Sequence, residues 1–203
     1  MIFDEGYWWP RKARYGVIKD SGAIDIFASR TPYFWSGVVL QAGGNVGVYP
    51  IRLLDWFDKV LTFELCPSNF TCLRKNIERY GGRIEAKNLA LGRGPGKVGV
   101  IPHMECGGHH VDQTGLGVEQ IAIDSLKLDR LDLLWLDIEG YEVEALYGAE
   151  KTVERFRPQI IVEDWPEYYG RYGDEKAIDW LERRGYSRVY RKKADVLYVD
   201  KSN

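Results

Sequence analysis

The chain has 203 residues, of which 45% are hydrophobic, and this is enough for one well-packed domain and short for two. Its formal net charge of −2 provides no global positive field that would draw it to nucleic acid or to an anionic membrane. We therefore expect a single domain over residues 1–203 whose partners are small molecules or proteins, with a homodimer left open.

The N-terminus and the cysteines bear on the cellular compartment. The first residues, "MIFDEGYWWPRKARYG", lack the basic start and apolar core of a secretion signal, and 18 apolar residues never run together. The three cysteines, Cys66, Cys72 and Cys106, form neither an even disulfide framework nor a CxxC zinc pair. We interpret them as reduced thiols in a cytoplasmic protein.

Short apolar runs alternate with helix-like segments along most of the chain. The runs are typical of buried parallel strands and lie at 38–42, 60–64, 84–91, 131–138 and 159–163. Apolar residues at helical spacing predict helices over 46–57, 67–80, 141–153 and 175–184. This alternation predicts an α/β core over residues 37–203, preceded by an aromatic-rich segment over 1–36. Ligands of such a sheet bind at the carboxyl ends of its strands.

The C-terminal stretch "YSRVYRKKADVLYVDK" departs from this alternation, because two strand-like runs are joined by a short polar link without room for a helix. It predicts an antiparallel hairpin that completes a mostly parallel, seven-stranded sheet. Such a Rossmann-like sheet resembles the class I methyltransferase fold more than a dinucleotide-binding dehydrogenase.

The first strand runs into a glycine-rich turn in "VVLQAGGNVGVYP", residues 38–50. Gly43, Gly44 and Gly47 let the backbone turn sharply and come close to a ligand. Asn45 tolerates an unusual φ and is placed to cap the following helix. The spacing does not give GxGxxG, so the pyrophosphate fingerprint is absent, and the glycines alone are equally consistent with an ordinary tight turn.

Glu64 strengthens the case for a ligand at this turn. It ends the second predicted strand, 20 positions after Gly44. A carboxylate at this place can accept hydrogen bonds from a ribose diol, whereas the alternative is a solvated strand-end acid. With the glycine turn upstream, we favour the ribose contact.

Four stretches carry a family resemblance: "VVLQAGGNVG", "LTFELCPSNFTCLRKNI", "NLALG" and "IAIDSLKLDRLDLLWLDIEGYEVEALYGAEKTVERFRPQIIVED". They follow in order the motifs of the FkbM family of S-adenosylmethionine-dependent methyltransferases, over residues 37–165. The resemblance implies a class I fold, S-adenosylmethionine as methyl donor, and usually a hydroxyl of a sugar or natural product as acceptor. By position it also implies a donor site made of Gln41, Gly43, Gly44, Asn45, Gly47, Glu64, Leu65, Asn88, Ala90 and Leu91.

Within that implied site the glycine turn would line the methionine and ribose, and Glu64 would hold the ribose hydroxyls. Leu65 would lie beside the adenine, where the family usually has Pro, and 88–91 would close its other side. Gln41 stands where the family usually has Asp, which accepts backbone N–H bonds and adds negative charge near the donor. We expect Gln41 to keep the turn but hold the donor less tightly, so that Gln41→Asp tightens donor binding. The rival interpretation is a noncatalytic binding module.

The acceptor side is predicted at "WLDIEGYEVEAL", where Asp137 and Glu139 share one face at the end of a strand. They could orient an acceptor hydroxyl, take its proton or bind a divalent cation, or only brace the turn and cap the next helix. We assign no metal ligands from the sequence.

Residues 102–117 predict a mobile loop near the site, because they are polar and rich in glycine. His109 or His110 in this loop could serve as general base. A metal site of Cys106, His109 and His110 lacks a recognised spacing, and a solvated loop is the stronger alternative.

Two aromatic clusters near the N-terminus could stack on an acceptor ring, although such residues more often cap a core or form a dimer contact. Their residues are Trp8, Trp9, Tyr33, Phe34 and Trp35. A nicotinamide-dependent oxidoreductase is a further rival, disfavoured by the absent fingerprint and the terminal hairpin.

Overall fold

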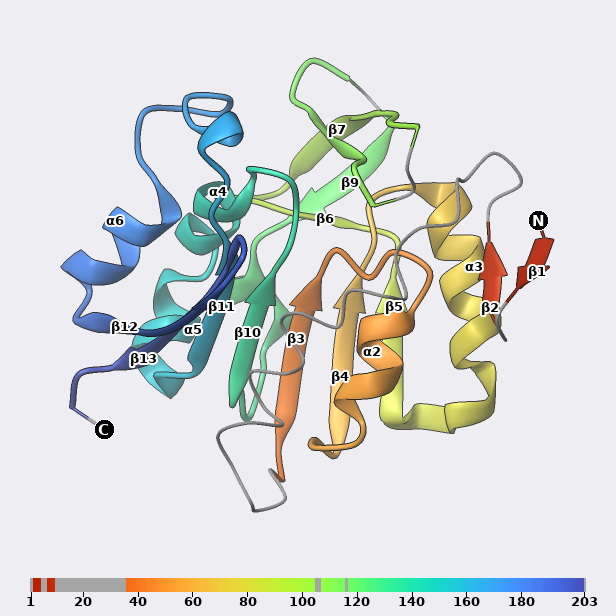
Figure 1. The fold of residues 1–203 in the computed structure, drawn as a ribbon, viewed down its shortest axis with the longest axis horizontal. Helices are drawn as coiled ribbons and strands as arrows, with labels where there is room; N and C mark the ends of the chain where they lie inside the picture. The colour runs from red at the N-terminus through yellow and green to blue at the C-terminus, as the bar shows by residue number, and fades with distance from the viewer. Residues whose placement is uncertain (1, 5–6, 10–35, 105–106, 116, 203) are drawn as a thin grey trace.

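The computed structural model describes residues 2–4, 7–9, 36–104, 107–115 and 117–202. Its centre is a seven-stranded sheet in the order β12-β13-β11-β10-β3-β4-β5 (Figure 1). The strands are β3 (Val38–Ala42), β4 (Lys59–Phe63), β5 (Ile84–Lys87), β10 (Leu133–Leu136), β11 (Gln159–Glu163), β12 (Tyr186–Lys192) and β13 (Asp195–Asp200). The first five pair in parallel, and β13 pairs antiparallel with β11 and β12. The predicted sheet with its C-terminal hairpin is confirmed.

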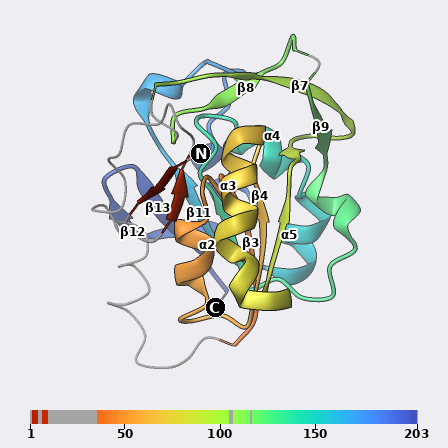
Figure 2. The ribbon, with the colours of Figure 1, turned by 90° about the vertical axis from the view of Figure 1, so that its right-hand side faces the viewer.

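Helices cover both faces of this sheet because its central strands are apolar on both sides (Figures 1 and 2). On β10, Leu134 and Leu136 pack into one core cluster, and Leu133 and Trp135 pack into the other. The first cluster is closed by α4 (Glu142–Tyr147), α5 (Glu150–Phe156) and α6 (Ala177–Arg183), and the second by α2 (Val48–Leu53) and α3 (Pro67–Ile77). The layers leave the carboxyl ends of the parallel strands open.

All four predicted helices are shorter or divided in the structure, and two of these differences bear on the site. The helix after the glycine turn begins at Val48, and Gly47 is its N-cap without a side-chain cap, so the prediction that Asn45 caps it is wrong. The helix expected over 141–153 is divided between α4 and α5 at Gly148. The carbonyl of Gly148 accepts the N–H of Asp124 at 2.8 Å instead of continuing the helix. Short 3-10 turns cover Glu78–Arg83, Ile123–Leu126 and Pro166–Tyr168.

A second sheet of four strands lies above the open end of the first (Figure 1). Its order is β6-β9-β7-β8, with β6 (Ala90–Leu91), β7 (Gly96–Ile101), β8 (His110–Asp112) and β9 (Val118–Ile121). The prediction of one strand over 84–91 is therefore wrong, because the chain changes sheets after Lys87. The prediction of a loop over 102–117 is also wrong in part: β8 pairs with β7, and Val111 is buried against Ala90 and Val98.

The N-terminal residues form a short antiparallel hairpin of β1 (Ile2–Asp4) and β2 (Tyr7–Trp9), with β2 beside α3 (Figure 1). Trp8 and Trp9 lie in β2, whereas Tyr33, Phe34 and Trp35 lie outside the described residues. The aromatic acceptor contact proposed for these residues stays a prediction. In the described part of the chain, no helix has the length and apolar character needed to cross a membrane.

Candidate active site

A cavity of about 220 Å³ lies at the carboxyl ends of β3, β4, β10 and β11, between the two sheets. This is the edge where the sequence predicts ligand binding. Of the predicted site residues, the cavity is lined by Gly43, Asn45, Glu64, Leu65, Ala90, Leu91, His109, Asp137 and Glu139. Gln41, Gly44, Gly47, Asn88 and His110 are not among its lining residues.

The glycine turn brings the chain close to both neighbouring strands. Gly43 has a φ of 87°, and a Cβ built on it would lie 1.9 Å from the carbonyl oxygen of Asp137, so no other residue fits. A Cβ on Gly44 would lie 2.6 Å from Thr62 Oγ1, and one on Gly47 would lie 2.9 Å from Leu73. Gly44 and Gly47 therefore allow close packing on β4 and α3, while Gly43 borders the cavity.

Glu64 ties this turn to the start of α3. Its Oε2 accepts the N–H of Asn45 at 2.6 Å, and its Oε1 accepts the N–H of Cys66 at 2.7 Å. Burial raises the pKa of Glu64 to about 8, although the two N–H donors act in the opposite direction. Each carboxylate oxygen can accept a second hydrogen bond, so Glu64 remains able to bind a ligand hydroxyl.

Asn45 offers the cavity an acceptor that the described chain leaves unsatisfied. It has a left-handed backbone, with a φ of 46°, and lines the cavity next to Glu64. Its Oδ1 is buried and has no hydrogen-bond partner among the described residues. A buried oxygen without a donor is costly, which indicates a place for a ligand that brings an N–H or O–H group.

Gln41 is fully buried beneath the turn, and its hydrogen bonds differ from those expected. Its Nε2 donates to the carbonyls of Ala42 and Gly43, at 3.3 and 2.8 Å, and its Oε1 accepts the hydroxyl of Thr62 at 2.5 Å. The idea that this side chain accepts turn N–H groups, as an Asp would, is wrong. The side-chain amide of Gln41 donates hydrogen bonds to two carbonyls. An ionised carboxylate has no hydrogen to donate and could not make these bonds.

The wall expected around the adenine is made of slightly different residues. Leu65 lines the cavity as predicted, and so do Ala90 and Leu91. Asn88 instead donates its amide to the carbonyls of Glu64 and Leu65, at 2.7 and 3.0 Å, and supports that wall from outside. Leu89 lines the cavity in its place.

Three carboxylates meet on the opposite side of the cavity. One oxygen from each of Asp137, Glu139 and Glu163 lies within 4.8 Å of the others, so this acid trio could hold a divalent cation. The sequence analysis missed Glu163, although it ends the strand beside β10 and therefore reaches the same edge. Within the described chain, its Oε2 is buried and has no hydrogen-bond partner, while Oε1 accepts Trp165 Nε1 at 2.7 Å.

The acid trio holds protons more strongly than isolated carboxylates do. Burial raises the pKa of Asp137 well above its usual range, and nearby Asp195 and Glu139 add to this. Burial also raises the pKa of Glu163, followed by the charge of Asp137. The pKa of Glu139 is raised by burial and lowered by the hydroxyl of Tyr168. A raised pKa makes each carboxylate a stronger base once it is ionised, a property that suits a general base.

The two histidines occupy different places. His109 lines the cavity, and its Nδ1 accepts the N–H of His103 at 2.9 Å. Its pKa is raised by a hydrogen bond with Cys66, whose own thiol pKa is lowered to about 6 by His109 and Ser68 against the effect of burial. His110 instead starts β8, with its ring 3.3 Å from the carbonyl of Gly108. Cys106 lies outside the described residues, so the cysteine–histidine metal site stays untested.

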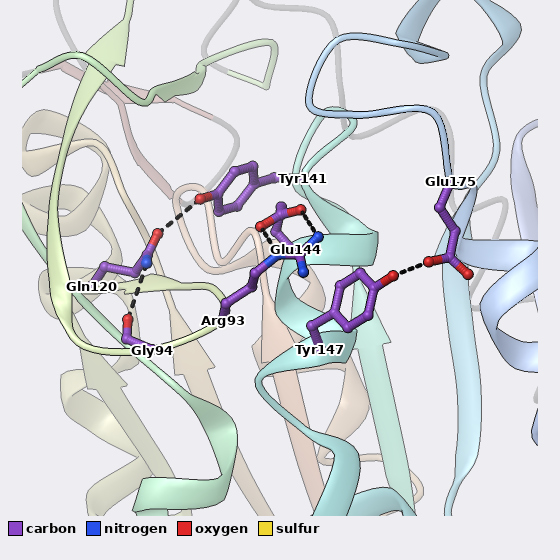
Figure 3. Close-up of polar contacts among 7 residues, drawn as sticks. All are labelled: Arg93, Gly94, Gln120, Tyr141, Glu144, Tyr147 and Glu175. Carbon is purple, nitrogen blue, oxygen red and sulfur yellow. Dashed lines mark hydrogen bonds and ion pairs between the residues drawn. The ribbon is translucent and has the colours of Figure 1, made fainter.

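The second sheet is fixed to α4 by polar contacts around Tyr141, which also lines the cavity (Figure 3). The hydroxyl of Tyr141 donates to Gln120 on β9 at 2.9 Å, and Gln120 donates to the carbonyl of Gly94 at 3.0 Å. Arg93 pairs with Glu144 on α4 through two hydrogen bonds of 2.6 and 2.8 Å. These contacts keep the second sheet over the cavity as its roof.

The geometry agrees with what the comparisons find. The profile of the Methyltransferase FkbM domain matches residues 41–188, so the chain belongs to this methyltransferase family. A protein described as "Methyltransferase 1", from Beauveria bassiana strain ARSEF 2860, is 20% identical over 196 residues, covering 81% of this chain and 78% of that protein. The suspected family is thereby confirmed.

Solved structures show the same fold. The FkbM methyltransferase of Methylobacillus flagellatus KT superposes with a TM-score of 0.61 at 18% identity, over 85% of this chain and 45% of its own. The chain thus spans less than half of that longer protein. The magnesium protoporphyrin IX methyltransferase of Synechocystis PCC 6803, solved with bound S-adenosylmethionine, gives a TM-score of 0.52 at 13% identity, over 88% of this chain and 76% of its own. The class I methyltransferase fold is confirmed.

Proposed function

We propose that the protein is an S-adenosylmethionine-dependent O-methyltransferase that acts on a hydroxyl of a sugar or small natural product. The proposal rests on one observation: two walls of different chemistry face each other across one cavity. The turn at Gly43 and Asn45 with Glu64 lies on one side, and the acid trio lies on the other. The first wall suits a nucleoside with a polar tail, and the second suits a hydroxyl that loses a proton.

The residues of the first wall fit the donor that this family and fold use, S-adenosylmethionine. When bound, it supplies an activated methyl group on a sulfonium. Glu64 would accept the ribose hydroxyls and Leu65 would pack on the adenine. The unsatisfied Oδ1 of Asn45 would accept a donor group of the ligand, so the residues present suit it.

On the second wall, Glu139 and Asp137 would orient the acceptor hydroxyl and take its proton, while Glu163 would supply a further acceptor. Enclosing both reactants in one geometry can contribute roughly 7 kcal/mol or more to the rate. His109 stands at the same cavity as the alternative base. The acidic lining and the net charge of −2 favour an uncharged small-molecule or glycan acceptor over nucleic acid or an anionic membrane. A cytoplasmic location and a homodimer stay predictions.

The first test is ligand binding. Thermal-shift screening with S-adenosylmethionine, S-adenosylhomocysteine and NAD should show stabilisation by the first two alone, because only a ligand of the native state raises the melting temperature. Stabilisation by NAD alone would favour an oxidoreductase.

The second test is methyl transfer to a panel of neutral methyl glycosides and phenols, followed by the formation of S-adenosylhomocysteine. Binding of the donor without transfer to any hydroxyl would favour a noncatalytic module. Parallel assays with added Mg²⁺ and with chelator would show whether the acid trio works with a cation.

A further inference from the structure

One segment outside the cavity contacts Glu139 at two points and Gly140 at a third. The segment is Pro166–Tyr168 with the following turn to Arg171, and it comes after β11. The hydroxyl of Tyr168 donates to Glu139 Oε2, and Arg171 Nη1 donates to the backbone carbonyl of Glu139 at 2.8 Å. The Cβ of Tyr168 also covers Gly140 so closely that a Cβ built there would lie 2.9 Å away.

Glu139 is a residue that needs such support. It has a φ of 59°, in the left-handed region that residues with a Cβ rarely adopt, and Gly140 follows with a φ of 97°. A backbone held in this conformation keeps it only where surrounding contacts demand it. The conformation places the Glu139 side chain on the cavity wall beside Asp137.

Tyr168 is suited to hold one carboxylate oxygen and leave the other open. Burial, followed by the hydrogen bond to Glu139, raises the pKa of Tyr168, so its hydroxyl stays protonated and donates. Arg171 packs on the Tyr168 ring, with 4.3 Å between the guanidinium carbon and the ring centroid. Tyr168 lines a smaller neighbouring hollow and not the donor cavity, so within the described chain its link to the donor cavity is its contact with Glu139 and Gly140.

We propose that Tyr168 and Arg171 are positioning residues, which fix the Glu139 carboxylate toward the acceptor hydroxyl. The proposal rests on the function proposed above, in which Glu139 faces the acceptor. Tyr168 acts on the carboxylate and Arg171 on the backbone, and together they keep Glu139 in its left-handed conformation.

Two neighbouring tyrosines, one in this segment and one directly after it, offer matched controls. Tyr169 donates its hydroxyl to Asp164, and Tyr172 donates its hydroxyl to the carbonyl of Val111 at 2.6 Å. Neither hydroxyl contacts Glu139, yet Tyr169→Phe and Tyr172→Phe remove the same atom from the same stretch of chain. They report what the loss of a tyrosine hydroxyl does to folding alone.

The experiment measures kcat and acceptor KM with the best hydroxyl probe of the glycoside and phenol panel, and the Kd of S-adenosylhomocysteine by calorimetry. Tyr168→Phe should lower kcat about tenfold, with KM and Kd within about twofold, because one hydrogen bond to a catalytic group is lost. Both control variants should keep kcat within about twofold. Arg171→Met should lower kcat in the same direction. In the Glu139→Gln background, Tyr168→Phe should cause no further loss, since its target is already inactive.

Two results would overturn the proposal. One is a kcat loss from Tyr168→Phe that is equally large in the Glu139→Gln background. The other is an unchanged kcat in Tyr168→Phe while the wild-type protein binds S-adenosylhomocysteine and transfers methyl. If the wild-type protein binds no donor, the proposed function itself fails, so the two failures are distinguishable.

Discussion

The two walls of the cavity differ in how their polar groups are satisfied. On the donor side, at the ends of β3 and β4, Gln41 serves two carbonyls and a hydroxyl, and both oxygens of Glu64 accept backbone N–H groups. On the acceptor side, at the ends of β10 and β11, the acid trio lies within 4.8 Å, and Glu163 Oε2 has no partner in the described chain.

This difference separates residues that build the site from residues that act in it. Groups satisfied by the chain itself stabilise the fold, whereas the clustered acids raise one another's pKa and destabilise the fold when ionised. These acids, and the unsatisfied Oδ1 of Asn45 on the donor wall, are available to a ligand. Substitutions on the donor wall should therefore cost stability. Substitutions in the acid trio should cost activity and leave the fold intact or more stable.

The largest expected effect is on the acceptor wall. Glu139→Gln and Asp137→Asn nearly preserve shape, and each should lower turnover by roughly 10² or more, as expected for the loss of a general base. Steady-state kinetics with calorimetry should show the donor affinity largely unchanged. Full activity in both variants, and in His109→Ala and His110→Ala, would exclude all four as the base. Normal turnover with reduced melting temperature would mean that the two acids only brace the turn.

On the donor wall, Glu64→Ala should weaken binding of S-adenosylhomocysteine by about 1 to 3 kcal/mol, the range for leaving a buried hydrogen-bond partner unsatisfied. The same variant should lose stability, because the N–H groups of Asn45 and Cys66 lose their acceptor. Calorimetry and urea denaturation measure the two effects on one sample. If a folded Glu64→Ala protein bound S-adenosylhomocysteine with unchanged affinity, Glu64 would not be part of the donor site.

For substitutions of Gln41 on the donor wall, the sequence and the structure predict opposite results. The sequence predicts that Gln41→Asp tightens donor binding. In the structure, Gln41→Asp and the isosteric Gln41→Glu place a carboxylate against the carbonyl of Gly43, and each should cost about 1 to 3 kcal/mol of stability. Urea denaturation measures this cost. Tighter donor binding in a fully stable Gln41→Asp protein would contradict the structural account.

The smallest expected effect is a gain in stability from Glu163→Gln. The unfolded chain ionises Glu163 near the ordinary pKa of 4.5, whereas the folded chain holds the proton to a higher pH. Above about pH 4.5, folding therefore requires Glu163 to take up a proton, and the free energy of unfolding of the wild-type protein falls as the pH rises. Glu163→Gln removes this penalty, so its gain should be on the order of 1 kcal/mol near neutral pH and larger at higher pH. Thermal melts across the pH range measure it, with Glu154→Gln on the exposed face of α5 as control.

Much of the sheet could be predicted from the sequence because its strands are buried on both faces. Apolar runs such as 131–138 and 159–163 mark such strands, and the glycine turn marks the edge where ligands bind. The second sheet escaped prediction because β8 and β9 are short and largely polar, and burial of Val111 and Val118 depends on contacts distant in sequence. Local pattern cannot reveal such contacts.

Site residues were predictable where their position in a strand decided their direction. Glu64 and Asp137 directly follow strand ends and line the cavity, whereas Glu139 also lines it but through a left-handed turn beyond β10 that alternation along a strand does not predict. The partners of Gln41 were not predictable, since donor and acceptor roles depend on which backbone groups face it. Tyr168 was also missed, because its contact with Glu139 joins two segments through the fold and leaves no spacing in the sequence.

The most direct test of the account is calorimetric titration of S-adenosylhomocysteine into the wild-type protein and into Glu64→Ala. We expect one binding site per chain, with affinity reduced about 5- to 150-fold in the variant, the equivalent of about 1 to 3 kcal/mol. No heat of binding in the folded wild-type protein, or equal affinity in the two proteins, would contradict the account.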